Sequence, residues 1–73
     1  MIKRLYELRE DNDLKQKDVA AYLNIAQRTY SGYETGTREM PIQLLKQLAL
    51  FYNTSIDYIL ELTDETKPYP RAH

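Results

Sequence analysis

The sequence contains no cysteine and only one histidine, and these absences exclude several classes of protein. Without cysteine, neither a disulfide nor a thiolate metal site can stabilise the fold. The single histidine, His73, is the last residue, and neither Ser31 nor Ser55 has a candidate base at a suggestive spacing. Metal sites and nucleophilic catalysis therefore lack their usual side chains. We expect no metal, no cofactor and no enzymatic activity.

Long apolar runs are also absent, and no signal-peptide pattern opens the chain. We therefore expect a cytoplasmic protein that makes no contact with a membrane. A chain of 73 residues has room for one domain with a modest core. Its hydrophobic fraction of 42% and charged fraction of 29% are typical of a globular domain rather than a disordered one.

The chain has no excess of positive charge, because its formal net charge is −1. This value argues against indiscriminate binding to nucleic acid, but a specific DNA-binding protein depends on where its charges lie. Acidic residues gather in two segments, residues 7–13 and 57–65. Residues 26–46 are slightly positive, with three basic side chains against two acidic ones: Arg28, Arg38 and Lys46 against Glu34 and Glu39.

Hydrophobic periodicity predicts five helices and no strands, over residues 2–10, 16–23, 26–34, 41–52 and 56–62. The expected boundary signals are Gly36 as a C-terminal stop, Pro41 as a helix-start proline and Ser55 as an N-cap. We expect one domain over residues 1–63, followed by a short flexible tail over residues 64–73.

Residues 16–34 read as two short helices joined by a tight turn at Asn24, a residue type that tolerates left-handed backbone. In the first helix the apolar stripe comprises Val19, Ala20 and Leu23; in the second it comprises Ala26, Tyr30 and Tyr33. The opposite face of the second helix carries an amide, a guanidinium, a hydroxyl and a glycine, namely Gln27, Arg28, Ser31 and Gly32. Such polar groups near a helix N-terminus read base edges, so this stretch is a candidate helix-turn-helix.

Two charged residues allow two interpretations each. Arg9 lies on the apolar stripe of the first predicted helix, where it either extends its head to solvent or pairs with an acid at the edge of the core. Lys15 precedes the second helix, where a cation beside first-turn amides suits a phosphate, although chance explains its position equally well.

Four short sequence motifs, in the order in which they occur along the chain, resemble those of the lambda-repressor-like, Cro-type (XRE-family) helix-turn-helix DNA-binding domains. They are LRE at 8–10, LKQKDVAAYLNI at 14–25, YETGTREMP at 33–41 and LALFYNTSIDYIL at 48–60. The resemblance covers roughly residues 2–62. It implies an all-α, compact five-helix fold in which the second and third helices form the helix-turn-helix.

The resemblance also implies a role for individual residues. Residues 26–34 would be the recognition helix, with Gln27, Arg28, Ser31 and Gly32 in its major-groove positions. Contacts to DNA phosphates would come from Lys15, Gln16, Lys17, Thr35, Thr37 and Arg38. Arg9 and Glu34 match a family pair that forms a partly buried salt bridge.

The chain departs from the family pattern at several positions. The family commonly has Gly at Asn24, Ser or Thr at Lys15 and Ala26, and Ile or Val at Tyr30. Gly32 removes a side chain from one reading position. We therefore expect base recognition to rest mainly on Gln27 and Arg28.

These observations favour a small stand-alone transcriptional regulator of the repressor type that binds double-stranded DNA as a homodimer. No small-molecule ligand is expected, because the chain leaves no room for a sensing domain. We expect the dimer interface in the remaining apolar surface, at Leu50, Phe51, Ile56 and Ile59. The alternative is a protein-interaction module, for example an antitoxin-like protein, that uses a helix-turn-helix fold with weak or no DNA binding.

Overall fold

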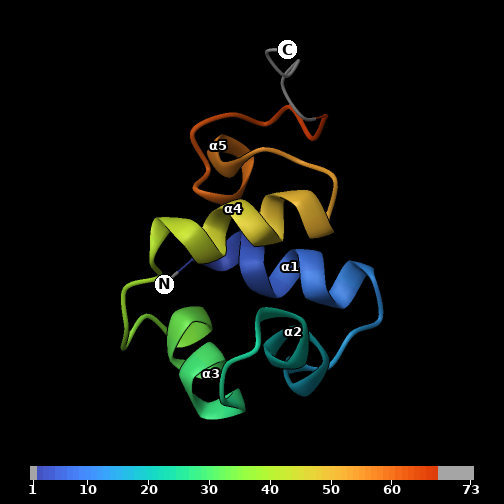
Figure 1. The fold of residues 1–73 in the computed structure, drawn as a ribbon. Helices are drawn as coiled ribbons and strands as arrows, with labels where there is room; N and C mark the ends of the chain where they lie inside the picture. Colours follow the sequence, from blue (N-terminus) through green and yellow to red (C-terminus); the bar gives the residue numbers. More distant parts are fainter. Residues whose placement is uncertain (1, 68–73) are drawn as a thin grey trace.

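The computed structural model describes residues 2–67, and their regular secondary structure is wholly helical (Figure 1). The five helices of this part of the chain are α1 (Lys3–Asp11), α2 (Gln16–Leu23), α3 (Gln27–Thr35), α4 (Ile42–Phe51) and α5 (Ile56–Ile59). The predicted all-α, five-helix fold is confirmed. Most of the tail predicted to be flexible, residues 68–73, lies outside the described residues, so the domain boundary at residue 63 stays a prediction.

The predicted helix boundaries are correct for α2 and differ by one residue at the ends of α1, α3 and α4. The prediction for α5 is wrong by three residues, because the helix ends at Ile59 rather than at Leu62. Glu61 adopts the left-handed conformation with φ of 63°, and the Leu62 N–H donates to the Asp57 carbonyl over 2.8 Å. This reversal of the chain closes the helix after a single turn.

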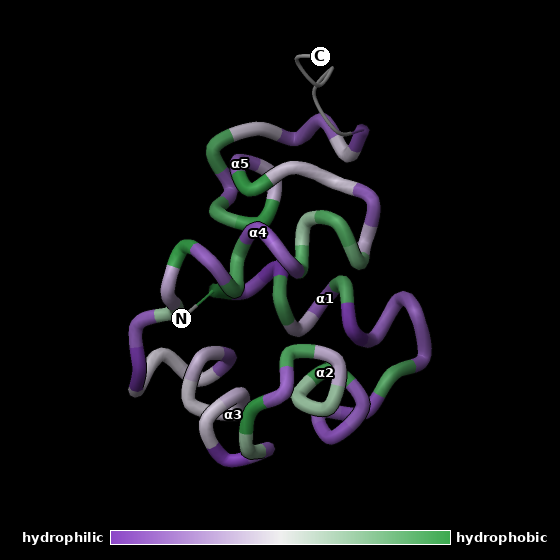
Figure 2. The backbone as a smooth tube through the Cα atoms, viewed as in Figure 1, coloured by the Kyte–Doolittle hydropathy of each residue, from purple (hydrophilic) through white to green (hydrophobic). Residues whose placement is uncertain are grey.

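The helices enclose one small core. α2 and α3 lie together at one end of the molecule, α4 and α5 lie at the other, and α1 passes between them (Figure 1). The hydrophobic stretches of α2, α4 and α5 stand out along the backbone, whereas the turn after α1 is hydrophilic (Figure 2). Every helix contributes to the buried apolar set: Leu5, Val19, Ala20, Leu23, Tyr30, Tyr33, Leu45, Leu48, Ala49 and Ile59. Fully burying one large aliphatic side chain contributes about 1.5–3 kcal/mol, so a core of this size can hold five short helices together.

None of the helices within residues 2–67 has the length and apolar character needed to cross a membrane.

Arg4 fastens the segment after α5 to the start of α1. Its guanidinium donates to the Tyr58 carbonyl over 2.9 Å and to the Asp64 carboxylate over 2.6 Å. The same guanidinium lies 4.1 Å from the centre of the Tyr58 ring. Because α5 is only one turn long, these contacts, together with the buried Ile59, fix its position against α1.

A buried ion pair joins α1 to α3. Arg9 is 9% exposed and Glu34 is 6% exposed. The guanidinium donates through Nε to Glu34 Oε2 over 2.7 Å and through Nη2 to Oε1 over 3.2 Å. Its remaining nitrogen, Nη1, donates to the Leu14 carbonyl over 2.9 Å. The pair expected from the resemblance is therefore present, and it answers the question that the position of Arg9 raised.

The Glu34 carboxylate is held in its charged form by these neighbours. Burial alone would raise its pKa, but the hydrogen bonds of Arg9 and Gln16 and the adjacent Tyr30 hydroxyl outweigh burial, and the pKa of Glu34 is lowered. The Tyr30 hydroxyl is buried beside the Glu34 carboxylate, although the two do not meet the geometric criteria for a hydrogen bond. Burial and the negative charge of Glu34 raise the pKa of Tyr30 above its usual range. Glu34 thus sits among donors that all favour its negative charge.

We predict that Glu34→Gln costs on the order of 3–5 kcal/mol of unfolding free energy, because it leaves the Arg9 charge buried without a partner. The double variant Arg9→Met, Glu34→Leu should recover much of that loss, because it replaces both charges with apolar groups. Urea unfolding of Arg9→Met, of Glu34→Leu and of the double variant measures the coupling energy between the two residues. If the two single-site losses simply add, the ion pair is not the cause.

Glu10→Gln is the matched control, because the Glu10 carboxylate meets Arg9 only at 3.6 Å and is half exposed. It should change the unfolding free energy by about 0.5 kcal/mol or less. The stabilisation from Glu34 should be present above about pH 4.3, the ordinary value for glutamate, and disappear as the pH falls through its lowered pKa. Glu34→Gln should therefore flatten the acid limb of the stability profile.

Candidate nucleic-acid interface

The turn between α2 and α3 is built around Asn24. Its φ of 59° and ψ of 44° place it in the left-handed region, as the sequence predicts. The Asn24 N–H donates to the Ala21 carbonyl over 3.1 Å, and the Ile25 N–H donates to the Ala20 carbonyl over 3.0 Å. These bonds satisfy the last carbonyls of α2, and Ala26 then starts α3 as its N-cap. The three residues together form the turn of a helix-turn-helix.

Packing against α2 fixes which face of α3 points outward. Val19, Ala20 and Leu23 of α2 are buried, as are Tyr30 and Tyr33 of α3. The small side chain of Ala20, only 2% exposed, lets the two helices approach closely. The outer face of α3 is therefore held rigidly by the core rather than by its own helix propensity.

Three of the four predicted base-reading residues lie where the sequence places them, on the outer side of α3. Gln27 and Arg28 are exposed and Ser31 is half-buried. Within residues 2–67, the side chains of Gln27 and Arg28 form no hydrogen bond or ion pair. Their donors are therefore free to meet a ligand.

Gly32, the fourth predicted base-reading residue, also lies on the outer side of α3, but its own surface is covered. Gly32 is buried, because side chains of the loop after α3 cover it. A Cβ placed on Gly32 would lie 2.9 Å from Arg38 Cδ and 3.1 Å from Thr37 Oγ1. The aliphatic stem of Arg38 thus occupies the place that a side chain at this position would take.

The start of α2 holds three of the predicted phosphate-contacting residues. Lys15 is the N-cap, and its N–H donates to Asp18 Oδ2 over 2.9 Å. Because an ammonium group cannot accept a hydrogen bond, only this half of a capping box forms. Lys15 and Lys17 are exposed, whereas Gln16 is half-buried and donates to Glu34 Oε1 over 3.2 Å. The Gln16 side chain therefore links the start of α2 to the end of α3.

The other three are Thr35, the last residue of α3, and Thr37 and Arg38 of the loop that follows. Both threonine hydroxyls bond the backbone of α3: Thr35 Oγ1 donates to the Ser31 carbonyl over 3.0 Å, and Thr37 Oγ1 donates to the Gly32 carbonyl over 3.5 Å. Each hydroxyl has one proton, so both would have to exchange these bonds before donating to a phosphate. Arg38 is exposed and carries the only full positive charge in this loop.

The charges of the molecule are unevenly distributed between its two ends, although each end carries both signs. The basic side chains Lys15, Lys17, Arg28 and Arg38 belong to the end formed by α2 and α3. The acidic side chains of residues 57–65 belong to the opposite end, around α5 (Figure 1). The exposed acids Asp18 and Glu39 lie at the same end as the four basic side chains, so the excess of positive charge at the helix-turn-helix is modest.

The residues predicted for a dimer interface are only partly accessible. Leu50 is 54% exposed and Phe51 is 38% exposed, whereas Ile56 is half-buried. The prediction for Ile59 is wrong: it is 0% exposed, because the inner side of α5 packs into the core. The sequence analysis missed Tyr22, whose ring lies 4.4 Å from that of Phe51 and extends the exposed apolar surface onto α2.

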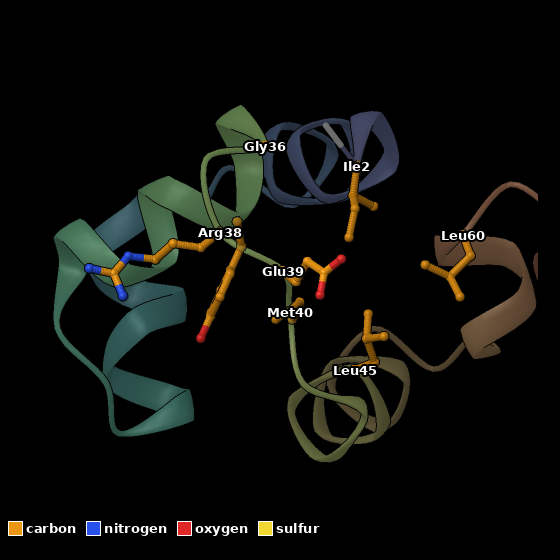
Figure 3. A pocket seen from close by; sticks show the side chains of 8 residues that line it. Ile2, Gly36, Arg38, Glu39, Met40, Leu45 and Leu60 are labelled. Carbon is orange, nitrogen blue, oxygen red and sulfur yellow. The ribbon is translucent and has the colours of Figure 1, made fainter.

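A shallow pocket of about 340 Å³ opens beside the loop after α3, on the side away from the Arg38 guanidinium (Figure 3). Ile2, Leu45 and Leu60 form its apolar walls, and Glu39 and Met40 of the loop also line it. Residues 2–67 contain no group of three His, Cys, Asp or Glu side chains that could hold a metal ion.

Comparison with known proteins agrees with this geometry. A family model described as Helix-turn-helix matches residues 5–59. The uncharacterized HTH-type transcriptional regulator YobD of Bacillus subtilis is 40% identical over 65 residues, which cover 89% of this chain and 58% of YobD. The HTH-type transcriptional regulator AnsR of the same organism is 35% identical over 69 residues, covering 94% of this chain and 60% of AnsR.

A third relative is the cryptic phage CTXphi transcriptional repressor RstR of Vibrio cholerae. It is 34% identical over 53 residues, which cover 73% of this chain and 48% of RstR. The chain thus spans about half to three fifths of the length of these relatives. Their names describe regulators and not enzymes, in agreement with the expectation of no enzymatic activity. No solved structure gives a significant match.

We predict that Asn24→Ala lowers the unfolding free energy by about 1 kcal/mol, because alanine is strained at positive φ. Asn24→Gly should cause no loss, because glycine adopts this conformation freely. Chemical denaturation measures both. Ala21→Gly, in the exposed interior of α2, is the control: there glycine should destabilise by about 1 kcal/mol. Equal losses for both Asn24 variants would show that the side-chain amide, and not the backbone, matters.

Proposed function

This chain belongs to the helix-turn-helix family, and from that premise we propose that it binds specific double-stranded DNA sequences as a transcriptional regulator of the repressor type. One observation carries the proposal: α3 presents Gln27 and Arg28, exposed and unpaired within residues 2–67, on a face that the core holds rigidly. Residues that read bases must be both free and preorganised. A regulator of this kind works where the DNA is, in the cytoplasm of a bacterial cell.

In the proposed mechanism, α3 enters the major groove with its N-terminal residues against the base edges. The guanidinium of Arg28 suits the two acceptors of a guanine, and the amide of Gln27 suits adenine. Lys15 and Lys17 contact phosphates beside the groove and set the register of the domain. Gln16 donates a hydrogen bond to Glu34. The buried carboxylate that joins α1 to α3 therefore also orients the Gln16 side chain, which would lie near the DNA backbone.

The alternative, a protein-interaction module, draws on the net charge of −1 and on the exposed Leu50. Salt distinguishes the two. Binding to DNA weakens steeply as the salt concentration rises, because counterions are released from the phosphates. An apolar contact with a protein lacks that dependence.

Arg28→Ala tests the proposed function. It should relax the preference at one base pair in each half-site, by roughly 1–3 kcal/mol, because a bidentate contact with guanine is lost. The preferred sequence is first found by selecting bound fragments from a random duplex library, and the variant is then titrated against single-base changes of that sequence. Loss of affinity that is uniform across all sequences would reduce Arg28 to a phosphate contact.

Lys15→Ala is the matched control for this experiment. It removes one positive charge from the same surface and should weaken binding to all sequences alike. The slope of log affinity against log salt should also become shallower by about 1. A wild-type protein that selects no duplex, or that binds one without any dependence on salt, would favour the interaction module instead.

We further propose that the protein acts as a homodimer. One short recognition helix contacts only a few base pairs, and a symmetric pair doubles the sequence that is read. Two half-sites would then lie one helical turn apart, roughly 34 Å. Leu50, Phe51 and Tyr22 form an exposed apolar surface on α4 and α2 that suits such an interface.

Leu50→Glu should keep the monomer folded, abolish association and remove cooperative binding to a duplex with two half-sites. Sedimentation and titration of that duplex are the measurements. Ile42→Glu is a close control, because Ile42 is 51% exposed against 54% for Leu50 and lies at the other end of α4. Cooperativity that survives Leu50→Glu but not Ile42→Glu would move the interface to the start of α4.

A further inference from the structure

Gly32 interrupts the outer face of α3, one helical turn beyond Arg28. At that point the helix has no side chain of its own, but the space above it is filled. A Cβ on Gly32 would lie 2.9 Å from Arg38 Cδ, closer than real Cβ atoms come to a neighbour, and 3.0 Å from Arg38 Cγ, so the Arg38 side chain would have to shift. The stem of Arg38 therefore crosses α3 at the one residue that has no side chain to block it.

Backbone hydrogen bonds hold the loop in this position. Gly36 adopts the left-handed conformation with φ of 87°, which turns the chain back over α3. The carbonyl of Gly32 then accepts from the Gly36 N–H over 3.0 Å and from the Arg38 N–H over 3.2 Å. The backbone of Arg38 is thus tied to the same residue that its side chain crosses.

The charged end of Arg38 is free. In the close-up view, its side chain points away from the other residues that line the shallow pocket and extends along α3 (Figure 3). Within residues 2–67, it forms no ion pair or side-chain hydrogen bond. An apolar stem packed on protein with a guanidinium left in solvent is a preorganised arrangement, because little freedom remains to be lost on binding.

We propose that Arg38 is a third base-reading residue, which supplies from the loop the side chain that Gly32 lacks and binds a guanine in the major groove. The inference rests on the proposed function and replaces the phosphate contact that the sequence predicts for Arg38. Gly32 lies four residues after Arg28 on the outer side of α3, so a guanidinium brought across it reaches a different base pair from the one read by Arg28. Because Gly32 has no side chain, the Arg38 side chain can pass over α3 at this position.

Two variants should converge on the same defect. Arg38→Ala removes the guanidinium, and Gly32→Ala displaces it while keeping its charge. Both should lose the preference for guanine at the same base pair, by roughly 10-fold, and that base pair should differ from the one affected by Arg28→Ala. The double variant Gly32→Ala, Arg38→Ala should lose no more preference than Arg38→Ala alone. Titration of the selected duplex and its single-base changes measures all of these.

Gly32→Ala also separates recognition from stability. Alanine is a better helix former than glycine, so its unfolding midpoint should equal or exceed that of the wild type while its base preference falls. Arg38→Lys should keep general affinity and lose the preference, because an ammonium cannot form the bidentate contact. Lys17→Ala is the control and should weaken binding to all sequences equally.

Equal weakening of all sequences by Arg38→Ala, or an unchanged preference in Gly32→Ala, would overturn the inference while leaving the proposed function intact. Failure of the wild-type protein to select any duplex would instead overturn both. The Arg28→Ala titration distinguishes the two cases, because it loses its own base pair only if α3 reads DNA at all.

Discussion

The ion pair between Arg9 and Glu34 is the interaction on which the rest of the structure depends. It is almost fully removed from solvent and joins the central helix α1 to the end of α3. Arg9 also binds the Leu14 carbonyl before α2, and Glu34 also binds the Gln16 amide at its start. One charged pair therefore fixes three elements relative to one another. Because such a pair tolerates few alternative geometries, it favours a single orientation of the outer face of α3.

The parts of the fold that depend on local chemistry could be predicted from the sequence. Apolar periodicity gave all five helices, and α2 was correct to the residue. Asn24 and Gly36 mark two of the five left-handed positions within residues 2–67, because few residue types adopt positive φ readily. Arg9 and Glu34 are 25 residues apart, and their pairing was inferred from a family resemblance rather than from spacing.

The errors arise where the outcome depends on tertiary contacts. An apolar stripe shows that a face is buried, but not whether the core or a partner buries it, so the sequence predicts an interface position for Ile59, which lies in the core. The sequence predicts a gap in the recognition surface at Gly32, because nothing in it shows that Arg38, six residues later, folds back across this glycine. The contact between Tyr22 and Phe51 joins α2 to α4 and has no local signal either.

The placement of charge at the two ends of the molecule bears on how quickly, and not only how tightly, a DNA site is found. The exposed basic side chains near α2 and α3 and the acidic residues around α5 make the distribution of charge uneven although the net charge is only −1. For the proposed binding to DNA, such a distribution would turn the α2–α3 end toward the polyanion before contact, so that a larger share of encounters would be productive.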